Sequence, residues 1–307
     1  MTSTIFGIAD RSVVEIAGQD ARTFLDATLT QRIADLVAQT WRSALWLDLH
    51  GAPLAVMDLV APDAPADVLL AIVPAELVDV VVDGLGGRTF LADARLQARD
   101  DLRVLVVRGE GASDIAAAAG AAEGTVGRLN GVLVLGRATG VDLVVATDDV
   151  PAWLERLDVP GARRVDALGL RARDIADGVP GWGCEITAPH LPEEVGLLPT
   201  HVHLDKGCYP GQEAVARMWM LGRPRRRLAR LDVTGSAIAG SEAGEGRDRT
   251  LVTSVAGPHA LGFVPPAVQV GDRIDGEGWA AVVAGFVGEA REVVGHNPGM
   301  TRRRDRT

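Results

Sequence analysis

Cys208 has the surroundings most suited to chemistry in this sequence. Gly207, Pro210 and Gly211 bracket Cys208 and Tyr209 in a segment that must turn sharply, because proline fixes one φ angle and glycine allows the reversed ones. A thiol on such a turn is presented to solvent or to a ligand more readily than it is packed in a core. The sequence therefore predicts an accessible cysteine.

Two features next to this cysteine favour the thiolate over the thiol. Lys206 lies two residues before Cys208, and residues 212–218 have the pattern of a helix that begins just after it. A nearby cation and a helix N-terminus both stabilise a negative charge. At an ordinary pKa of about 8.5 roughly 3% of a thiol is ionised at neutral pH, and a pKa one unit lower gives about a quarter. We expect a reactive thiol, the alternative being a small buried hydrophobe.

The same stretch carries a family resemblance. Residues 206–213, Lys-Gly-Cys-Tyr-Pro-Gly-Gln-Glu, are similar to the Lys-Gly-Cys-Tyr-x-Gly-Gln-Glu signature of the YgfZ family. The resemblance implies a tetrahydrofolate-binding accessory protein that serves iron–sulfur client or assembly proteins, on a fold shared with the glycine-cleavage T-protein, an aminomethyltransferase. It implies that Cys208 is the working thiol and that Lys206 tunes it. Tyr209, Gln212 and Glu213 are implied to shape the surroundings of the thiol, and the remaining motif residues are Gly207, Gly211 and Arg217. Because Arg217 lies four residues after Glu213, we expect the two to pair if the segment is helical.

Two acidic residues are candidates for a folate site through the T-protein relationship. Asp58 lies where that family carries its catalytic aspartate after a hairpin, and it can also be interpreted as a polar residue at a strand end. Glu194 lies in Pro-Glu-Glu-Val-Gly-Leu, which is similar to a Pro-x-Glu-Ala-Gly-Leu segment. Its carboxylate could accept hydrogen bonds from a pterin, or belong to a solvated acidic loop.

The sequence also departs from the family. Arg11 and Leu170 stand where some members have aromatic residues in the folate pocket. Residues 174–180 keep only the isoleucine, glycine and proline of another family segment. Folate binding is therefore a separate prediction from family resemblance.

Composition describes a soluble globular protein. With 307 residues, 47% of them hydrophobic and 23% charged, the chain is long enough for two or three cores. We expect no signal peptide and no membrane span, because no basic N-terminal segment or long apolar run is present. Two cysteines do not make a disulfide framework, so we expect a cytoplasmic protein. A net charge of −10 argues against nucleic-acid binding.

Hydrophobic periodicity predicts an α+β fold with a duplicated strand/helix core and a small C-terminal β-barrel. In the first subdomain, residues 1–98, we expect a strand at 12–16, a helix at 20–33, a hairpin of 41–49 and 54–60, a strand at 68–73 and a helix at 74–85. In the second, residues 99–225, we expect strands at 102–107, 126–129, 132–135 and 141–146 and helices at 113–119, 151–157 and 165–177. Residues 226–300 read as a barrel of short strands, and 301–307 as a flexible tail.

A metal site is a second interpretation of the residues around Cys208. His190, His201 and His203 with Cys208 could form a ligand set, but no Cys-x-x-Cys or His-Glu-x-x-His framework supports it. A resident iron–sulfur cluster usually needs four thiolates, and the chain has two cysteines, so we expect no permanently bound metal. The basic run at 223–227 is either a solvated strand entry or an attractor for an anionic group.

Three functions remain open at the level of sequence. The first is the tetrahydrofolate-dependent accessory role in iron–sulfur cluster assembly, insertion or repair. The second is an enzyme that transfers a one-carbon unit, as an aminomethyltransferase using Asp58. The third is a folate-binding or docking module in which Cys208 performs no chemistry.

Overall fold

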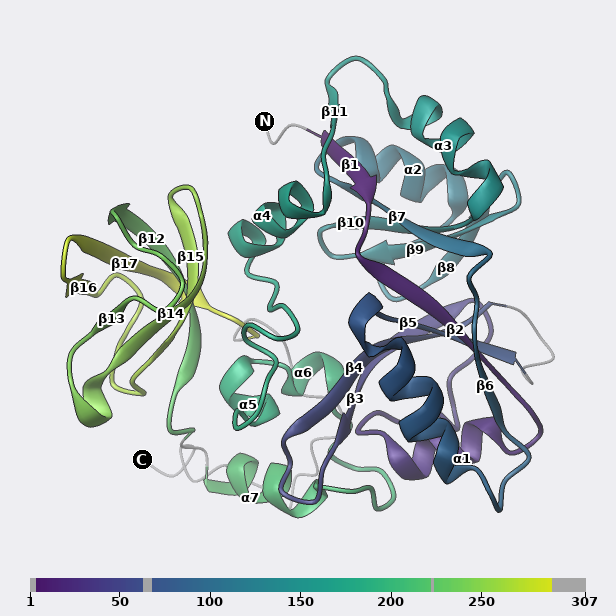
Figure 1. Cartoon of the computed structure of the whole chain (residues 1–307), viewed down its shortest axis with the longest axis horizontal. Helices are drawn as coiled ribbons and strands as arrows, with labels where there is room; N and C mark the ends of the chain where they lie inside the picture. Colours follow the sequence, from purple (N-terminus) through teal and green to yellow (C-terminus); the bar gives the residue numbers. More distant parts are fainter. Residues whose placement is uncertain (1–3, 63–67, 222–223, 289–307) are drawn as a thin grey trace. The chain divides into compact units, whose positions relative to one another are not determined.

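The computed structural model describes residues 4–62, 68–221 and 224–288 (Figure 1). It divides into two compact units, of which the first comprises Met1–Thr28, Arg32–Ala44 and Ala55–Leu170, and the second Leu29–Gln31, Leu45–Leu54 and Arg171–Thr307. The predicted tail at 301–307 and the last part of the predicted barrel region, 289–300, lie outside the described residues. No described helix is both long and apolar enough to cross a membrane.

The first sheet contains five strands in the order β3-β4-β5-β2-β6. Their bounds are β2 Arg11–Ala17, β3 Thr40–Leu47, β4 Pro53–Ala61, β5 Val68–Pro74 and β6 Arg95–Ala98. The predicted hairpin is confirmed, because β3 and β4 are neighbours joined by residues 48–52. Within that turn the Asp48 side chain accepts hydrogen bonds from the backbone N–H groups of His50 and Ala52, which favours the tight reversal.

Two predicted helices of this region differ in the structure. Helix α1 (Ala21–Thr28) ends before residue 33, because the Asp26 carboxylate accepts hydrogen bonds from the backbone N–H groups of Ile33 and Ala34 and folds the chain back. Pro74 ends strand β5, where it pairs with Arg11, and it directly precedes the first helical turn. The helix predicted for 74–85 is confirmed as a continuous helical segment over 75–88, but its geometry changes along its length, with 3-10 turns at Ala75–Leu77 and Gly86–Arg88 and a π-helical segment at Val80–Leu85.

The second sheet contains six strands in the order β11-β1-β7-β10-β9-β8. Their bounds are β1 Thr4–Ile8, β7 Leu102–Arg108, β8 Val126–Leu129, β9 Val132–Arg137, β10 Gly140–Ala146 and β11 Ala162–Arg164. Strand β1, at the start of the chain, pairs antiparallel with β7 and parallel with β11. Asn130 and Gly131 both have positive φ, as a two-residue hairpin turn requires, and join β8 to β9 as predicted.

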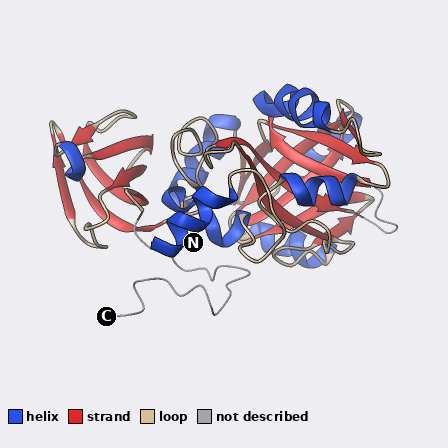
Figure 2. Ribbon diagram, turned by 90° about the horizontal axis from the view of Figure 1, so that it is seen from below, coloured by secondary structure: helices blue, strands red, loops and turns tan. Residues whose placement is uncertain are grey.

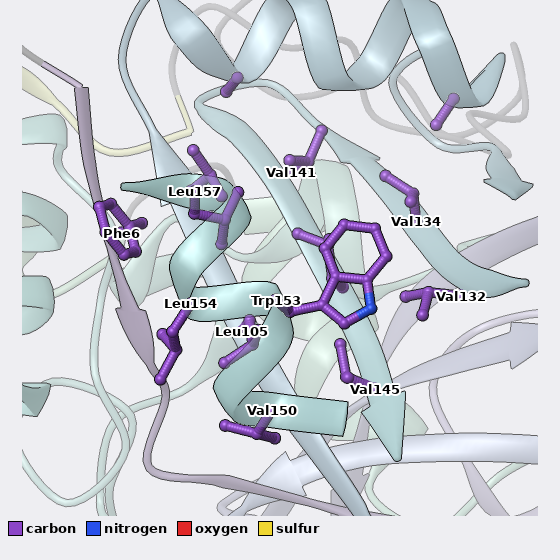
Figure 3. Packing of buried hydrophobic residues seen from close by; sticks show 14 residues of the cluster. Phe6, Leu105, Val132, Val134, Val141, Val145, Val150, Trp153, Leu154 and Leu157 are labelled. Carbon is purple, nitrogen blue, oxygen red and sulfur yellow. The ribbon is translucent and has the colours of Figure 1, made fainter. Parts of the chain in front are cut away.

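Helices cover one face of the second sheet. Helices α2 (Gly111–Ala119) and α3 (Val150–Leu157) pack there, and the Trp153 ring lies over valines of β9 and β10 (Figure 3). The buried residues of this cluster are Phe6, Leu105, Val107, Ala112, Ala121, Val132, Val134, Val141, Leu143, Val145, Val150, Trp153, Leu154 and Leu157. Helix α3 begins with Pro151 in its first turn, a position that proline tolerates.

The opposite face of the second sheet packs on the first sheet. Val104 and Val106 of β7 point to this side, since alternate residues of a strand face opposite ways, and they pack with Val13 and Ile72 of the first sheet. Strands buried on both faces need apolar residues at consecutive positions. This explains why β7 and β10 carry nearly continuous apolar runs.

The second unit contains short helices and a C-terminal sheet. The helices are α4 (Ala167–Asp177, from Arg171), α5 (Pro192–Val195), α6 (Leu198–His201) and α7 (Gln212–Leu221). Gly178, with φ +80°, follows α4. The connection from α4 to α7 contains the short helices α5 and α6.

The C-terminal sheet has the order β13-β14-β15-β12-β17-β16. Its strands are β12 Arg227–Gly235, β13 Glu242–Ala243, β14 Thr250–Ala256, β15 His259–Val264, β16 Arg273–Gly276 and β17 Trp279–Phe286. The edge strands β13 and β16 approach each other, so the sheet curls into a nearly closed barrel (Figure 2). The predicted α+β class with a C-terminal β-barrel is confirmed.

Trp153→Ala is expected to lower the free energy of unfolding by about 3–5 kcal/mol, because it removes the largest side chain of the helix-covered cluster and leaves a cavity. Glu155→Ala changes an exposed residue of the same helix and is expected to stay within about 0.5 kcal/mol of the wild type. Urea unfolding followed by circular dichroism compares the two. Equal losses in both variants would contradict the packing role of Trp153.

Candidate functional site

Cys208 lies on the turn between α6 and α7, and it is exposed. Its neighbour Tyr209 is buried, so the two side chains of the turn separate into one that faces solvent and one that anchors the segment. Burial raises the pKa of the Tyr209 phenol above its ordinary value, which keeps it neutral. The predicted accessibility of the cysteine is confirmed, and its reactivity stays a prediction.

Lys206 ties this turn to residues 29–31, which follow α1 in the chain. Its ammonium nitrogen donates hydrogen bonds to the backbone carbonyls of Leu29, at 2.7 Å, and Gln31, at 2.9 Å. The same nitrogen lies 5.3 Å from the centre of the Tyr209 ring, within the range of a cation–π contact. Lys206 therefore positions the turn, and the predicted effect of its charge on the thiol stays a prediction.

Residues 29–31 hold further contacts on the same side. The Thr30 hydroxyl donates a hydrogen bond to the carbonyl of His201 at 2.6 Å, and the backbone N–H of His203 donates to the carbonyl of Thr30 at 2.9 Å. Thr30 is fully buried. The strap formed by residues 29–31 therefore fixes the end of α6 and, through Lys206, the cysteine turn that follows it.

The tip of the β3–β4 hairpin packs against the other end of the turn. Gly211 has φ +81°, and a Cβ atom there would lie 2.5 Å from the carbonyl oxygen of Asp48. Gly51 has φ +86°, and a Cβ atom there would lie 2.9 Å from the Cβ atom of Ala214. Both positions exclude larger residues. Gly207 differs, because a Cβ atom there would have no heavy atom within 4 Å.

Helix α7 begins directly after this turn, as predicted. The backbone N–H of Gln212 donates a hydrogen bond to the carbonyl of Tyr209 at 3.3 Å. Glu213 and Arg217 are both exposed, and within the described part of the chain no ion pair joins them. The expected pair is therefore absent, since solvent competes for both charges.

Glu194 is buried and caps its own short helix. One of its carboxylate oxygens, Oε2, accepts a hydrogen bond from the backbone N–H of Leu191 at 3.1 Å, and it lies 3.8 Å from Nδ1 of His190. The interpretation of Glu194 as part of a solvated acidic loop is therefore wrong. Its other oxygen, Oε1, has no hydrogen-bond partner among the described residues.

Glu185, in the same connection, is a residue whose role sequence reasoning did not find. It is fully buried and accepts hydrogen bonds from Arg171 at 2.7 Å, the Gly181 backbone at 2.8 Å, Thr253 at 2.7 Å and Ser254 at 2.5 Å. It therefore joins α4 and the following loop to β14. Nothing in the sequence distinguishes it from the other glutamates of residues 178–199.

The three histidines considered as metal ligands have separate surroundings. His190 stacks on Phe263 at 3.9 Å between ring centres, Nδ1 of His201 lies 2.7 Å from the Thr200 hydroxyl, and Nδ1 of His203 accepts a hydrogen bond from the Asp205 backbone. No group of three or more metal-ligating side chains is found among the described residues.

The basic run has local partners where it is described. Arg226 donates a hydrogen bond to the carbonyl of Arg249 at 3.2 Å, and the Arg227 guanidinium lies 3.4 Å from the centre of the Phe286 ring. Arg223 lies outside the described residues. The described arginines thus support the entry into β12.

Asp58 belongs to a charged cluster in the first unit, defined here as Arg11, Asp58, Arg108, Arg137 and Asp142. Arg137 bridges the two aspartates, at 2.7 Å to Asp58 and 2.6 Å to Asp142. Arg11 also contacts both, with a 3.0 Å ion pair to Asp142. Arg108 lies 2.9 Å from the other oxygen of Asp142. The cluster connects β2 and β4 of the first sheet to β7, β9 and β10 of the second.

The arginines hold both aspartates ionised. Burial alone would raise the pKa of Asp58, but Arg137 and Arg11 outweigh it and hold that pKa well below the usual range. Burial likewise opposes ionisation of Asp142, and Arg137, Arg108 and Arg11 lower its pKa to about 2. The burial of these ions is tolerated because each oxygen is paired.

Asp58 is not the strand-end polar residue that the sequence suggested. It lies inside β4, where Oδ1 accepts a hydrogen bond from the Ser43 hydroxyl at 2.6 Å and Oδ2 accepts from Arg11 and Arg137. A carboxylate with both oxygens engaged and a low pKa is a weak base. Leu170 is also buried, in the apolar core between the two sheets.

Comparison with solved structures relates this architecture to an aminomethyltransferase. The chain is similar to the crystal structure of glycine cleavage system aminomethyltransferase T from Bartonella henselae, with a TM-score of 0.75 and 17% sequence identity over 98% of this chain and 87% of the other. The likeness shows that the chain has the T-protein fold. No protein-family profile and no curated protein sequence matches the chain.

Gly211→Ala is expected to lower the free energy of unfolding by about 2 kcal/mol or more, because it combines an unfavourable φ with a backbone clash. It should also change the rate at which Cys208 is alkylated, measured in a Cys184→Ser background. Gly207→Ala is the matched control and should leave both quantities nearly unchanged. Equal effects of the two substitutions would contradict the packing of the hairpin tip on the turn.

The charged cluster predicts a loss of stability in acid. A depressed carboxylate pKa contributes stability that is present above the unfolded pKa of about 3.9 and is lost as pH falls through the folded pKa. For Asp142, with a folded pKa of about 2, the unfolding free energy should fall by about 2 kcal/mol between pH 4 and pH 2, with Asp58 adding to it. Urea unfolding across this range tests it. Asp142→Asn should be less stable at pH 7 and show a shallower acid loss, and an unchanged slope would refute the assignment.

Proposed function

We propose that this protein is a tetrahydrofolate-dependent accessory protein for the assembly, insertion or repair of iron–sulfur clusters, with Cys208 as its working thiol. The observation that carries the proposal is the placement of this thiol. Cys208 is exposed on a turn held by Lys206 on one side and by the close approach of Gly211 to the hairpin tip on the other. A side chain held this way is preorganised for contact with a partner.

The chemistry proposed for Cys208 is ligation of iron in a cluster that passes to or from a client protein. The thiolate is the metal ligand, so the thiol proton is lost to solvent and one sulfur–iron bond forms as a thiolate of the partner leaves that iron and takes up a proton, with no change of oxidation state. The remaining ligands are proposed to come from the partner, because no group of three or more metal-ligating side chains is found among the described residues. The iron–sulfur cluster is therefore proposed as cargo and not as a resident cofactor. The acidic net charge of −10 supports protein partners in preference to nucleic acid.

The two candidate folate residues, Glu194 and Asp58, differ in how well they fit tetrahydrofolate. The amino-pyrimidine edge of a pterin donates hydrogen bonds, and Glu194 has a buried carboxylate with Oε1 still available to accept one. Asp58 does not fit this role, because both of its oxygens are engaged. Tetrahydrofolate, when bound, supplies a reduced pterin that can carry a one-carbon unit, and Glu194 is proposed to orient it.

The geometry favours this proposal over aminomethyl transfer. That reaction would use Asp58 at the position of the catalytic aspartate, yet this carboxylate is enclosed by Ser43, Arg11 and Arg137. The docking-module alternative keeps the exposed cysteine but gives it no chemistry. Substitution of Cys208 separates the docking module from the accessory role, because only the accessory role requires sulfur at position 208.

Calorimetric titration with tetrahydrofolate is the first test. Wild type and Cys208→Ser are expected to bind with similar affinity, because the thiol is not assigned to the folate site, and Glu194→Gln is expected to bind about tenfold more weakly. Absence of binding in the wild type would remove folate from the proposal.

Complementation of a deletion strain tests the role of the thiol. Activity of iron–sulfur enzymes should be restored by the wild type and by Cys184→Ser, the other exposed cysteine, but not by Cys208→Ser. Full restoration by Cys208→Ser would favour a docking module. Aminomethyl transfer by the purified protein, abolished by Asp58→Ala, would favour the enzyme alternative.

A further inference from the structure

The charged cluster of the first unit carries an uncompensated positive charge. Its three guanidinium groups, Arg11, Arg108 and Arg137, face two carboxylates, Asp58 and Asp142, which leaves a surplus of one positive charge. Both carboxylates are ionised, because their pKa values are depressed. A surplus charge in a largely buried cluster is less favourable than the same charge in water, and a bound anion would stabilise it.

Donors of the cluster remain available after the internal pairs are made. Nε of Arg11 and Nη1 of Arg137 form no hydrogen bond with any described residue. Nε of Arg108 is buried without a hydrogen-bond partner. Every aspartate oxygen, by contrast, already accepts a hydrogen bond, from an arginine or, for Oδ1 of Asp58, from the Ser43 hydroxyl. An incoming group would therefore meet donors and not acceptors, which selects an anion.

Solvent reaches the cluster at Arg11. The Arg11 side chain is 25% exposed, compared with 7% for Asp58 and 0% for Asp142. The half-buried Trp41 ring has its centre 4.1 Å from the Arg137 guanidinium carbon, and its indole N–H donates a hydrogen bond to the carbonyl of Gly136. The cluster thus combines one accessible side chain, Arg11, with largely buried partners, and the low dielectric around the buried partners strengthens charge pairing.

We propose that Arg11 and Arg137 form a binding site for a carboxylate monoanion. One negative charge neutralises the cluster, whereas a phosphate dianion would leave a surplus of the opposite sign. The planar guanidinium fork matches the planar carboxylate. The ligand class is a small molecule or substituent that presents one carboxylate to Arg11. This site is independent of Cys208 and of the iron–sulfur chemistry proposed for that residue.

Formate serves as the probe because it is the smallest carboxylate. Thermal unfolding and calorimetry of the full chain at neutral pH, with chloride replacing formate at constant ionic strength, measure its binding. Formate is expected to raise the unfolding temperature of the wild type. Arg11→Gln makes the cluster neutral and should weaken formate binding by about tenfold or more. Arg103→Gln, which removes an arginine of the same unit outside the cluster, should leave binding unchanged.

Asp58→Asn provides the opposite charge change. It raises the surplus to two, so formate should bind several-fold more tightly than to the wild type. If the charged cluster had only a structural role, Arg11→Gln and Asp58→Asn would both lower stability, and they would not change formate binding in opposite directions. Equal formate responses in wild type, Arg11→Gln and Asp58→Asn would overturn the proposal, as would no response in the wild type. If Arg11→Gln does not fold, the Asp58→Asn comparison decides by itself.

Discussion

The pairing of two buried aspartates with three arginines is the constraint on which the first unit depends. Asp142 is fully buried, and its charge is tolerable only because Arg11, Arg108 and Arg137 converge on it. These side chains come from strands of both sheets, so the sheets can pack only in the register that brings them together. Removing one partner from such a buried set typically costs about 3–5 kcal/mol. The apolar core beside the cluster supplies the burial, and the cluster restricts how the sheets combine.

A second set of close contacts positions the cysteine turn. Lys206 donates to two carbonyls of the strap at 29–31, and Gly211 lets the hairpin tip approach the start of α7. The strap follows α1 in the sequence, and the hairpin tip lies between β3 and β4. Both segments nevertheless belong to the second unit. The turn that displays Cys208 therefore depends on two short segments distant in the chain as well as on its own glycines.

The T-protein fold does not by itself assign the chemistry. Folds host different activities, and function belongs to the side chains at a site. Here Asp58 is enclosed in ion pairs of the first unit, while the second unit holds an exposed thiol, Cys208, on a turn. The residues that departed from the expected aromatic pocket have clear roles, because Arg11 is part of the charged cluster and Leu170 is part of the core.

The sequence by itself determined the features that depend on local dihedral angles and periodicity. These include the Asn130-Gly131 hairpin, the α+β pattern with its C-terminal barrel, the start of α7 and the accessible turn at Cys208. Only the tertiary structure decided the partners of Lys206, Glu185 and Asp58 and the early end of α1. Arg11 and Asp142, for example, are 131 residues apart in the chain. Such pairs depend on how the sheets and segments pack. Residue types and local spacing do not indicate which two distant charges will be buried next to each other.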